Sequence, residues 1–222
     1  MKQIIVGIDE AGRGPLAGPV VASAFVFLNT KYLIHNTYNL RDSKLLSALQ
    51  RERIYTELYQ NPDVYWGVGK VSEKQIDKIN IYQATRLAMK KAVLSLERKL
   101  RKRAGIAGEL PVNKMRDRAF RLPVTIIDSL VIDGNMLLDL PMRQKAIIKA
   151  DTTILQCMAA SIVAKVTRDR LMLRLHQKYP LYGFDRHKGY GTPQHMAMLK
   201  IYGPSPIHRL SFAPCRDHSI EV

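Results

Sequence analysis

Two adjacent acids, Asp9 and Glu10, follow an apolar run near the start of the chain and are the first candidates for chemistry. The run over residues 4–8 is rich in β-branched side chains, which indicates a buried strand. A carboxylate at such a place loses hydration that only a partner or a metal ion restores. Because neighbouring side chains on a strand point to opposite faces, we expect both acids to reach one cation only if the strand ends here and Gly12 and Gly14 turn the chain. On the dipeptide alone, an exposed acidic pair at a strand end is the simpler interpretation.

Two further aspartates occupy similar positions. Asp133 ends an apolar run before a glycine turn, and Asp151 closes residues 146–151 before a helix predicted to start near Thr153. A helix N-cap is the alternative role for Asp151, since aspartate is favoured there. Acids at the tips of three strands would form one cluster at the edge of a sheet, which only cations make tolerable. Such oxygen ligands favour Mg²⁺ or Mn²⁺, and two of these ions would activate water and stabilise the leaving oxygen in phosphodiester hydrolysis.

The string DEAGRGPLAGPVVA, which starts at Asp9, resembles the opening motif of type 2 ribonucleases H, most closely the bacterial ribonuclease HII group. The other matching motifs follow in the family's order: RDSKLLS (41–47), VIDGN (131–135), KADTT (149–153), AASIVAKVTRDRLM (159–172), YGFDRHKGYGT (182–192) and HRLSFAP (208–214). The resemblance therefore spans nearly the whole chain. It implies that Asp9, Glu10, Asp133 and Asp151 are the catalytic, metal-binding acids, although Asp151 stands in KADT where the family commonly has KGDS.

Recognition of RNA requires contact with the 2′-hydroxyl. In Gly12, Arg13 and Gly14, the missing glycine side chains would let main-chain groups approach a ribose closely. Tyr190 is a candidate ring for packing on the sugar and donating a hydrogen bond. An ordinary glycine turn and a half-buried tyrosine are the alternatives from the residues alone. The resemblance implies that this loop and this tyrosine recognise the ribonucleotide 5′ to an RNA–DNA junction.

Phosphate contacts have two candidate sources. Ser43 and Lys44 lie near the start of a predicted helix, where N–H groups, a hydroxyl and an ammonium can all face an anion. Ser161, Lys165 and Arg168 are spaced by four and three on a polar face of the helix after residue 151. A solvated helix face is the alternative interpretation, and the resemblance implies a backbone-binding edge beside the metals. Further cations toward the C-terminus are His187, Lys188, His208 and Arg209.

The elements that must position these residues follow from local pattern. After the opening strand, strands are predicted over residues 20–28, 63–71, 124–134 and 146–151. Helices are predicted over residues 45–59, capped by Ser43 or Ser47, from a capping box formed by Ser72 and Gln75, over 80–102, and over most of the remainder. Three strands, helices, then two strands each leading into a helix indicate an α/β fold with a mixed sheet. The resemblance implies the ribonuclease H-like fold, a five-stranded mixed sheet flanked by helices, with a small helical C-terminal subdomain.

The length fits a single domain, residues 1–222, with a catalytic core over about 1–175 and a C-terminal helical part over about 176–222. Residues 97–122 form a basic insertion that is longer than the family's usual connection. It is either a solvated, partly disordered loop or a phosphate-tracking arm.

The charge of +16 favours a polyanionic partner but does not choose among DNA, RNA, ribosome and membrane. The chain has neither a secretory signal nor an apolar run long enough to span a bilayer. We therefore expect a cytoplasmic protein without a membrane partner. A monomer is expected because no large apolar face is left unexplained.

Together, the residues and the resemblance predict a metal-dependent endoribonuclease that hydrolyses the RNA strand of RNA–DNA hybrids. It would also incise 5′ of single ribonucleotides in duplex DNA, leaving a 3′-hydroxyl and a 5′-phosphate, and so remove misincorporated ribonucleotides and primer remnants. The alternatives are another metal-dependent nuclease of similar fold, which would cleave an all-DNA duplex, and a non-catalytic basic RNA-binding protein.

Overall fold

The structure, a computed structural model, describes residues 3–29, 31, 40, 43, 45–106 and 125–216. Along the chain its elements are β1 (Ile5–Ala11), β2 (Val20–Phe27), α2 (Ala48–Gln60), β3 (Val64–Val71), α3 (Glu73–Arg103), β4 (Ser129–Asp133), β5 (Arg143–Ile147), α4 (Ala150–Thr153), α5 (Leu155–Lys178), the 3-10 turn η2 (Pro180–Tyr182), α6 (Phe184–His187), α7 (Pro193–Tyr202) and α8 (Ala213–Arg216).

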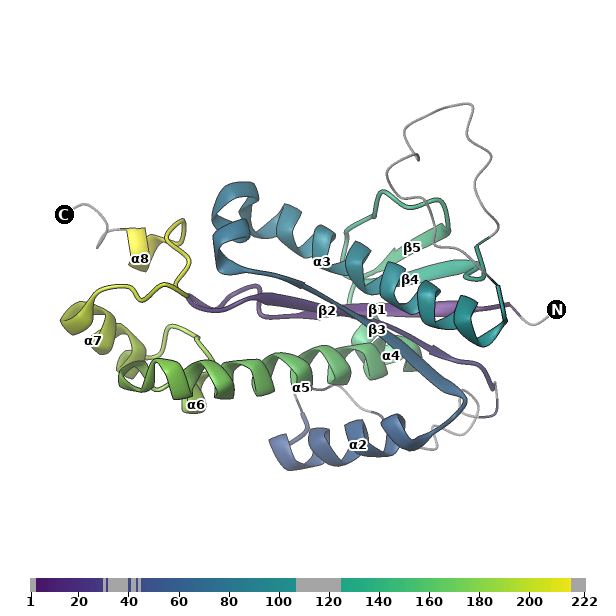
Figure 1. Cartoon of the computed structure of the whole chain (residues 1–222), viewed down its shortest axis with the longest axis horizontal. Helices are drawn as coiled ribbons and strands as arrows, with labels where there is room; N and C mark the ends of the chain where they lie inside the picture. Colours follow the sequence, from purple (N-terminus) through teal and green to yellow (C-terminus); the bar gives the residue numbers. More distant parts are fainter. Residues whose placement is uncertain are drawn as a thin grey trace.

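The strands form one mixed sheet in the order β3-β2-β1-β4-β5 (Figure 1). β2 is antiparallel to both β1 and β3, whereas β4 is parallel to both β1 and β5. β1 is therefore the central strand, and the carboxyl ends of β1 and β4 meet at the same edge of the sheet. The predicted α/β fold with a five-stranded mixed sheet is confirmed.

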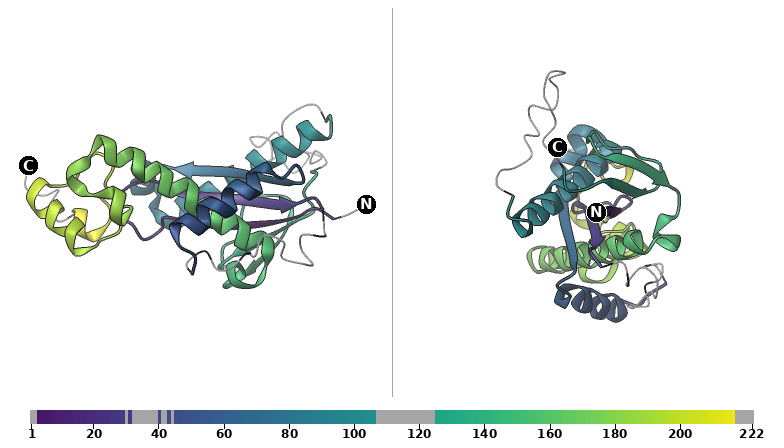
Figure 2. Two further views of the ribbon diagram at one scale, coloured as in Figure 1. Left: turned by 90° about the horizontal axis from the view of Figure 1, so that it is seen from below. Right: turned by 90° about the vertical axis from the view of Figure 1, so that its right-hand side faces the viewer.

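Helices cover both faces of the sheet, α3 on one side and α5 with α2 on the other (Figures 1 and 2). The alternation of side chains along β2 serves both layers. Ala24 and Val26 pack in the cluster that contains Ala88 and Leu96 of α3. Phe25 lies with Ile162 of α5 in the second cluster. Burial on both faces explains why the central strands are apolar throughout.

Gly7 allows α5 to lie against β1. A Cβ atom at this position would sit 2.3 Å from the carbonyl carbon of Gln156 and 2.5 Å from the backbone nitrogen of Cys157. Residues two apart on a strand share a face, so Asp9 points toward the same helix. The absence of one side chain thus sets the distance between the first acid and the start of α5.

Replacing Gly7 with alanine is expected to lower the free energy of unfolding by about 2 kcal/mol or more, because a well-packed interior has no room for the added methyl group. Gly105→Ala is the control: its φ is +68°, so it carries backbone strain, but its Cβ would meet nothing within 4 Å. Urea denaturation of both variants measures the difference. Equal destabilisation of the two would contradict the close approach of α5 to β1.

The last two strands differ from their predicted bounds. The fourth was predicted over 124–134 and the fifth over 146–151, but β4 and β5 are shorter and β5 begins earlier. Lys149 adopts the left-handed conformation with φ 60° and begins α4, so Asp151 lies in a helix and not at a strand tip. β4 leads to β5 through residues 134–142, which contain no helix, so the prediction of a helix after this strand is wrong.

The helices around the sheet differ in part from their predicted extents and caps. The short helix expected after Ser72 and the longer one over 80–102 form one element, α3, which is interrupted by non-helical geometry at Asn80 (φ 63°, ψ 165°). The capping box expected at Ser72 is wrong, because that side chain makes no capping hydrogen bond. Ser47, by contrast, caps α2 and forms a complete capping box with Gln50.

The first residues of the predicted basic insertion, 97–103, belong to α3. Its remaining residues from 107 to 122 lie outside the described part of the chain. Neither the loop nor the phosphate-tracking arm is therefore tested.

The C-terminal helices α6, α7 and α8 gather at the end of the molecule opposite to the N-terminus (Figure 1). They enclose a separate apolar cluster that includes Phe184, Leu199 and Cys215, together with Leu16 from the loop after β1. The small helical C-terminal subdomain is thus present, while its predicted boundary near residue 175 stays a prediction. The loop that follows the first acids packs directly against this subdomain.

Candidate active site

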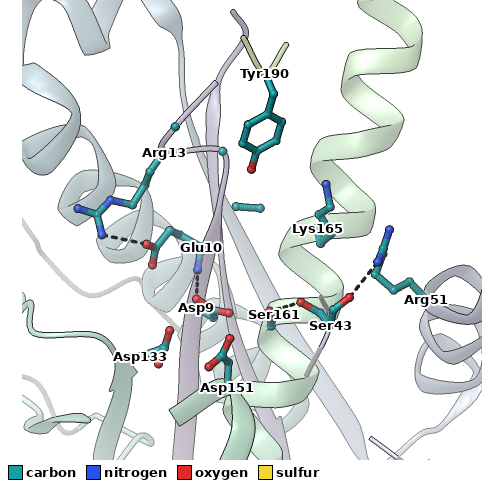
Figure 3. Close-up of a pocket in the computed structure, with 13 residues that line it drawn as sticks. Asp9, Glu10, Arg13, Ser43, Arg51, Asp133, Asp151, Ser161, Lys165 and Tyr190 are labelled. Atoms are coloured by element: carbon teal, nitrogen blue, oxygen red, sulfur yellow. Dashed lines mark hydrogen bonds and ion pairs between the residues drawn. The ribbon is translucent and has the colours of Figure 1, made fainter. Parts of the chain in front are cut away.

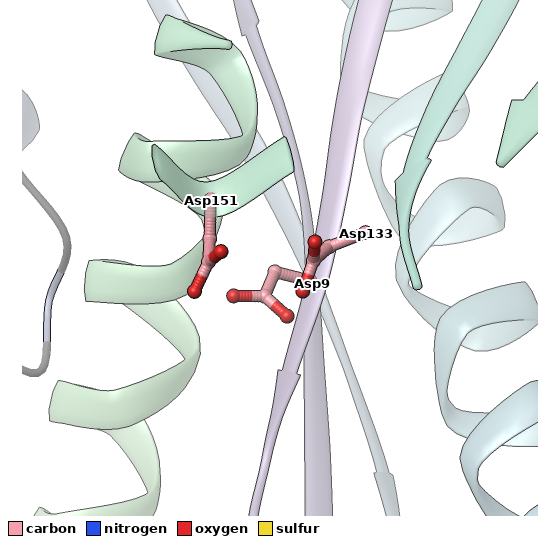
Figure 4. Close-up of side chains that lie close together, drawn as sticks. All are labelled: Asp9, Asp133 and Asp151. Carbon is pink, nitrogen blue, oxygen red and sulfur yellow. The ribbon is translucent and has the colours of Figure 1, made fainter. Parts of the chain in front are cut away.

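Three aspartates meet at the centre of the molecule: Asp9 on β1, Asp133 at the end of β4 and Asp151 in α4 (Figure 4). Each offers a carboxylate oxygen, and these oxygens all lie within 4.8 Å of one another. Asp9 and Asp151 are buried, and Asp133 is partly buried. The carboxylate cluster predicted from three separate segments is therefore assembled.

The pairing of the strands explains this meeting. β1 and β4 are parallel with Ile8 opposite Ile132, so the next residues, Asp9 and Asp133, lie side by side at the ends of the two strands. The backbone N–H of Ala150 donates to Oδ1 of Asp133 at 2.7 Å and holds α4 against β4. Because Lys149 is the N-cap of α4, the alternative that Asp151 caps the helix is wrong.

Burial and repulsion act together on the first acid. The pKa of Asp9 is raised well above its ordinary value, mainly by loss of hydration and then by the negative charges of Glu10 and Asp133. A hydrogen bond from Ser161 offsets part of this. Burial and mutual repulsion both disfavour charged carboxylates at this site. A hard divalent cation fits such a site, because it binds oxygen ligands and neutralises their charge.

Glu10 differs from its expected position. β1 continues through Ala11, with Glu10 still paired to Ala22 of β2, so the strand does not end between the two acids. Successive side chains on a strand diverge, and Glu10 is not part of the cluster of three carboxylates. Its Oε1 lies 3.3 Å from Nη1 of Arg13, and it lines the same pocket.

A pocket of about 400 Å³ opens beside the aspartates (Figure 3). It is lined by Asp9, Glu10, Ala11, Gly12, Arg13, Gly14, Ser43, Arg51, Asp133, Asp151, Ser161, Lys165 and Tyr190. Acidic groups gather at one end, and Lys165 and Arg51 lie on one side of it. The pocket thus places basic side chains beside the carboxylates.

The candidate ribose-binding groups lie at the other end of the pocket. Tyr190 points into it from the segment after α6, and its ring faces the loop of residues 12–14 (Figure 3). A Cβ atom at Gly14 would be 3.7 Å from Cε1 of that ring. Tyr190 is 45% exposed, which argues against the alternative of a core tyrosine.

Most of the predicted phosphate-binding residues also meet here. The hydroxyls of Ser43 and Ser161 are 2.7 Å apart, which joins the segment before α2 to α5. Lys165 lies on α5 one turn further on and pairs with Asp169 at 2.9 Å. Lys44 lies outside the described residues.

Arg168 does not contact the pocket, so its predicted role in direct phosphate binding is corrected. Its side chain is 1% exposed and donates to the carbonyl oxygens of Ala17, Pro19 and Lys188 at 3.0–3.1 Å. Burial lowers the pKa of this guanidinium to about 10. The helical spacing correctly predicts the face of α5 on which Arg168 lies. It does not predict that the side chain is buried, because the loop after β1 covers that end of α5.

Arg51 is a pocket residue that the sequence reasoning missed. It lies in the first turn of α2, and its Nη1 donates to the carbonyl oxygens of Ser43 and Leu46 at 2.8 and 2.6 Å. The signal was present, because a basic residue four positions after the capping Ser47 lies near a helix N-terminus that was already expected to bind phosphate.

A mixed five-stranded sheet between helices, with clustered aspartates from its paired central strands beside a basic pocket, defines a metal-dependent phosphodiester hydrolase of the ribonuclease H fold. The family model described as Ribonuclease HII matches residues 6–215. The chain therefore belongs to the ribonuclease HII family.

Individual relatives agree with this assignment. The chain is 43% identical to the ribonuclease HII of Burkholderia pseudomallei (strain 668), over 97% of this chain and 86% of that protein. It is 44% identical to the ribonuclease HII of Burkholderia thailandensis over the same shares. The crystal structure of ribonuclease H2 from Pyrococcus horikoshii OT3 superposes with a TM-score of 0.68 at 27% identity, covering 97% of this chain and 96% of that one.

The protein is a metal-dependent endoribonuclease of the ribonuclease H type, whose substrates are RNA–DNA hybrids. No helix in the described part of the chain is long and apolar enough to cross a membrane.

Proposed function

We propose that this enzyme hydrolyses the RNA strand of hybrids and also incises duplex DNA on the 5′ side of a single ribonucleotide, leaving a 3′-hydroxyl and a 5′-phosphate. The observation that carries the proposal is the pocket itself, in which the glycine loop and Tyr190 face the same space as the three aspartates. A group that contacts the 2′-hydroxyl within this pocket holds the adjacent phosphodiester beside the carboxylates.

Asp9, Asp133 and Asp151, with Glu10 at the rim, would hold two divalent cations, Mn²⁺ or Mg²⁺. When bound, these ions supply a nucleophilic water at neutral pH and stabilise charge on the leaving oxygen. The carboxylates would hold these ions, and the side chains themselves would form no covalent bond to the substrate. Burial of Asp9 excludes bulk water from one side of the site.

Gly12, Arg13 and Gly14 would contact the ribose through the main chain, and Tyr190 would pack on the sugar and donate its phenolic hydrogen to the 2′-hydroxyl. A deoxyribose offers no such partner, so the tyrosine hydroxyl would lose a hydrogen bond on DNA. The enzyme would thus distinguish RNA from DNA at the nucleotide beside the cleaved bond.

Ser43, Lys44, Ser161 and Lys165 would contact phosphates on either side of the scissile bond, and Arg51 is added to this set. Hydroxyls and cations of this kind fix the register of a duplex without reading its sequence. The charge of +16 supports the same kind of partner.

We also propose that the enzyme acts as a cytoplasmic monomer that removes misincorporated ribonucleotides and primer remnants. The incision chemistry supports this role, since a 3′-hydroxyl is the end that a DNA polymerase extends. We place the whole of residues 1–222 in one functional domain, with the C-terminal part serving the ribose-binding end of the pocket.

Three labelled duplexes test the proposal: one with a single ribonucleotide, one an RNA–DNA hybrid and one all DNA, each with Mn²⁺, Mg²⁺ or EDTA. Metal-dependent cleavage 5′ of the lone ribonucleotide, with the all-DNA duplex intact, is expected. Cleavage of the all-DNA duplex would favour a general nuclease, and tight binding without any cleavage would favour a basic binding protein.

Arg51→Ala is expected to raise KM for every ribonucleotide-containing duplex about three- to tenfold, with kcat nearly unchanged, and to reduce the slope of affinity against salt by about 1. The reason is the loss of a phosphate contact that is independent of sequence. Arg53→Ala is the matched control, since Arg53 lies on the same helix, is 83% exposed and pairs with Glu57. Binding titrations at several salt concentrations measure both, and equal effects would remove Arg51 from the site.

A further inference from the structure

A short and mostly buried segment, residues 205–209, joins the C-terminal helices to the loop after β1. His208 forms an isolated antiparallel bridge with Ala17, and the N–H of Arg209 donates to the carbonyl oxygen of Leu16 at 2.8 Å. His208 is 2% exposed and Arg209 is 0% exposed. Neither side chain lines the pocket, so the expectation that they supply cations for phosphate is wrong.

Arg209 holds the glycine loop through its carbonyl groups. Its Nη2 donates to the carbonyl oxygen of Gly12 at 2.6 Å, and its Nη1 donates to that of Arg13 at 2.9 Å. Two further bonds reach the carbonyl oxygen of Gly18 at 3.0 and 2.8 Å. All three nitrogens of this guanidinium therefore donate to backbone carbonyl oxygens. Burial lowers its pKa to about 9.

This contact sets the direction of the opposite side of the loop. In a trans peptide the C=O and N–H groups point in opposite directions, and no described peptide bond is cis. With the carbonyls of residues 12 and 13 turned toward Arg209, the N–H groups of Arg13 and Gly14 point away from it. The same residues line the pocket, so a ribose bound there would meet the side of the loop that carries these two donors.

His208 is linked to Tyr190 by hydrogen bonds whose direction is fixed. The N–H of Ser205 donates to Nδ1 of His208 at 2.9 Å, so that nitrogen carries no proton. A neutral His208 then carries its proton on Nε2, which lies 2.9 Å from Nε2 of His195 and donates to it. His195 must therefore be protonated on Nδ1, which donates to the carbonyl oxygen of Tyr190 at 2.9 Å.

Both imidazoles are held neutral by their surroundings. Burial is the main cause that lowers the pKa of His195 and of His208 to about 4 each. The ring of His187 stacks on His195 with centroids 4.5 Å apart, and the ring of Tyr182 lies 4.9 Å from that of His208. The chain of donors is therefore defined at neutral pH and ends at the backbone of the tyrosine that faces the ribose.

We propose that His208 and Arg209 are positioning residues for recognition of the 2′-hydroxyl, Arg209 through the glycine loop and His208 through His195 and Tyr190. Two consecutive residues thus fix both sides of the ribose-binding end of the pocket from behind. The proposal rests on the proposed function, since it assigns specificity to the same pocket.

The tautomers are tested without any cleavage assay. Long-range ¹H–¹⁵N correlation spectra of the full chain, labelled with ¹⁵N-histidine at pH 7.5, are expected to show His208 protonated on Nε2 and His195 protonated on Nδ1. A His195 protonated on Nε2, or a charged ring at either position, would overturn the chain of hydrogen bonds. This result is independent of whether the enzyme cleaves at single ribonucleotides.

Kinetics test the role of the hydrogen bonds that link His208, His195 and Tyr190. His208→Phe keeps a ring but no donor, and we expect kcat on the single-ribonucleotide duplex to fall at least tenfold with KM within threefold. His208→Gln keeps an amide donor toward His195 and is expected to recover part of kcat. Tyr182→Phe is the control, because it removes a partly buried hydrogen bond to Gly203 in the same subdomain and keeps the ring that packs on His208.

Arg209→Lys tests the second contact. A lysine ammonium has no planar fork to bond the carbonyls of Gly12, Arg13 and Gly18 together, so the same selective loss of kcat is expected. Circular dichroism at the assay temperature establishes that each variant is folded. A kcat within twofold of the unmodified enzyme for His208→Phe and Arg209→Lys, or a loss equal to that of Tyr182→Phe, would overturn the proposal.

Discussion

Replacing Asp133 with asparagine is expected to lower kcat for hybrid cleavage by about a thousandfold or more, while binding of the duplex is unchanged or tighter. The amide oxygen still accepts the hydrogen bond from Ala150, so α4 stays in place. What is lost is one negative charge from the cluster that Asp133 forms with Asp9 and Asp151, and with it the ability to hold catalytic cations. Removal of that charge also weakens repulsion of the phosphates.

Asp139→Asn provides the control for this prediction. Asp139 lies in the connection between β4 and β5, its side chain is 84% exposed and it pairs with Lys90. Single-turnover cleavage and fluorescence anisotropy, measured on both variants in Mg²⁺ and Mn²⁺, separate chemistry from binding. Cleavage by Asp133→Asn at a rate near that of Asp139→Asn would mean that the carboxylate cluster does not carry the reaction.

Replacing Tyr190 with alanine is expected to lower kcat/KM on the single-ribonucleotide duplex about a hundredfold, because a ribose that is held loosely misplaces the adjacent phosphodiester. Tyr190→Phe keeps the ring and loses only the phenolic hydrogen bond, so a loss of about tenfold is expected. On a continuous RNA–DNA hybrid both losses should be smaller, since the duplex can rebind in several registers.

Tyr202 offers a matched comparison for both substitutions. It lies on α7 and is 51% exposed, close to the 45% exposure of Tyr190, but it is not among the residues of the pocket. Steady-state kinetics with the two duplexes give, for each variant, the ratio of its kcat/KM to that of the unmodified enzyme. A ratio for Tyr190→Ala equal to that for Tyr202→Ala would show that the tyrosine takes no part in recognising the ribose.

Much of the site could be predicted, because the pairing of parallel strands determines which strand ends lie side by side. Asp9 and Asp133 both end apolar runs, and parallel neighbours bring such ends together whatever lies between them in the chain. Asp151 was placed in the cluster for the wrong reason, as a strand tip. A single left-handed residue, Lys149, converts the end of an apparent strand into a short helix, and local propensity does not reveal that change.

The arginines show where sequence reasoning fails. Helical spacing places Arg168 on the polar face of α5, but burial depends on a loop about 150 residues earlier that covers it. Arg209 is similar, since its partners at Gly12 and Gly18 come from the opposite end of the chain. A cation with carbonyl partners and one with phosphate partners look alike in sequence, because only the fold decides which of them meets water.

Anomalous diffraction from crystals of the enzyme grown with Mn²⁺ and a non-cleavable hybrid tests the central claim most directly. The account predicts manganese peaks in contact with the carboxylates of Asp9, Asp133 and Asp151, and the loss of at least one peak in Asp133→Asn. Peaks elsewhere, or a duplex bound with no manganese at these aspartates, would contradict the assignment of the cluster as the catalytic metal centre.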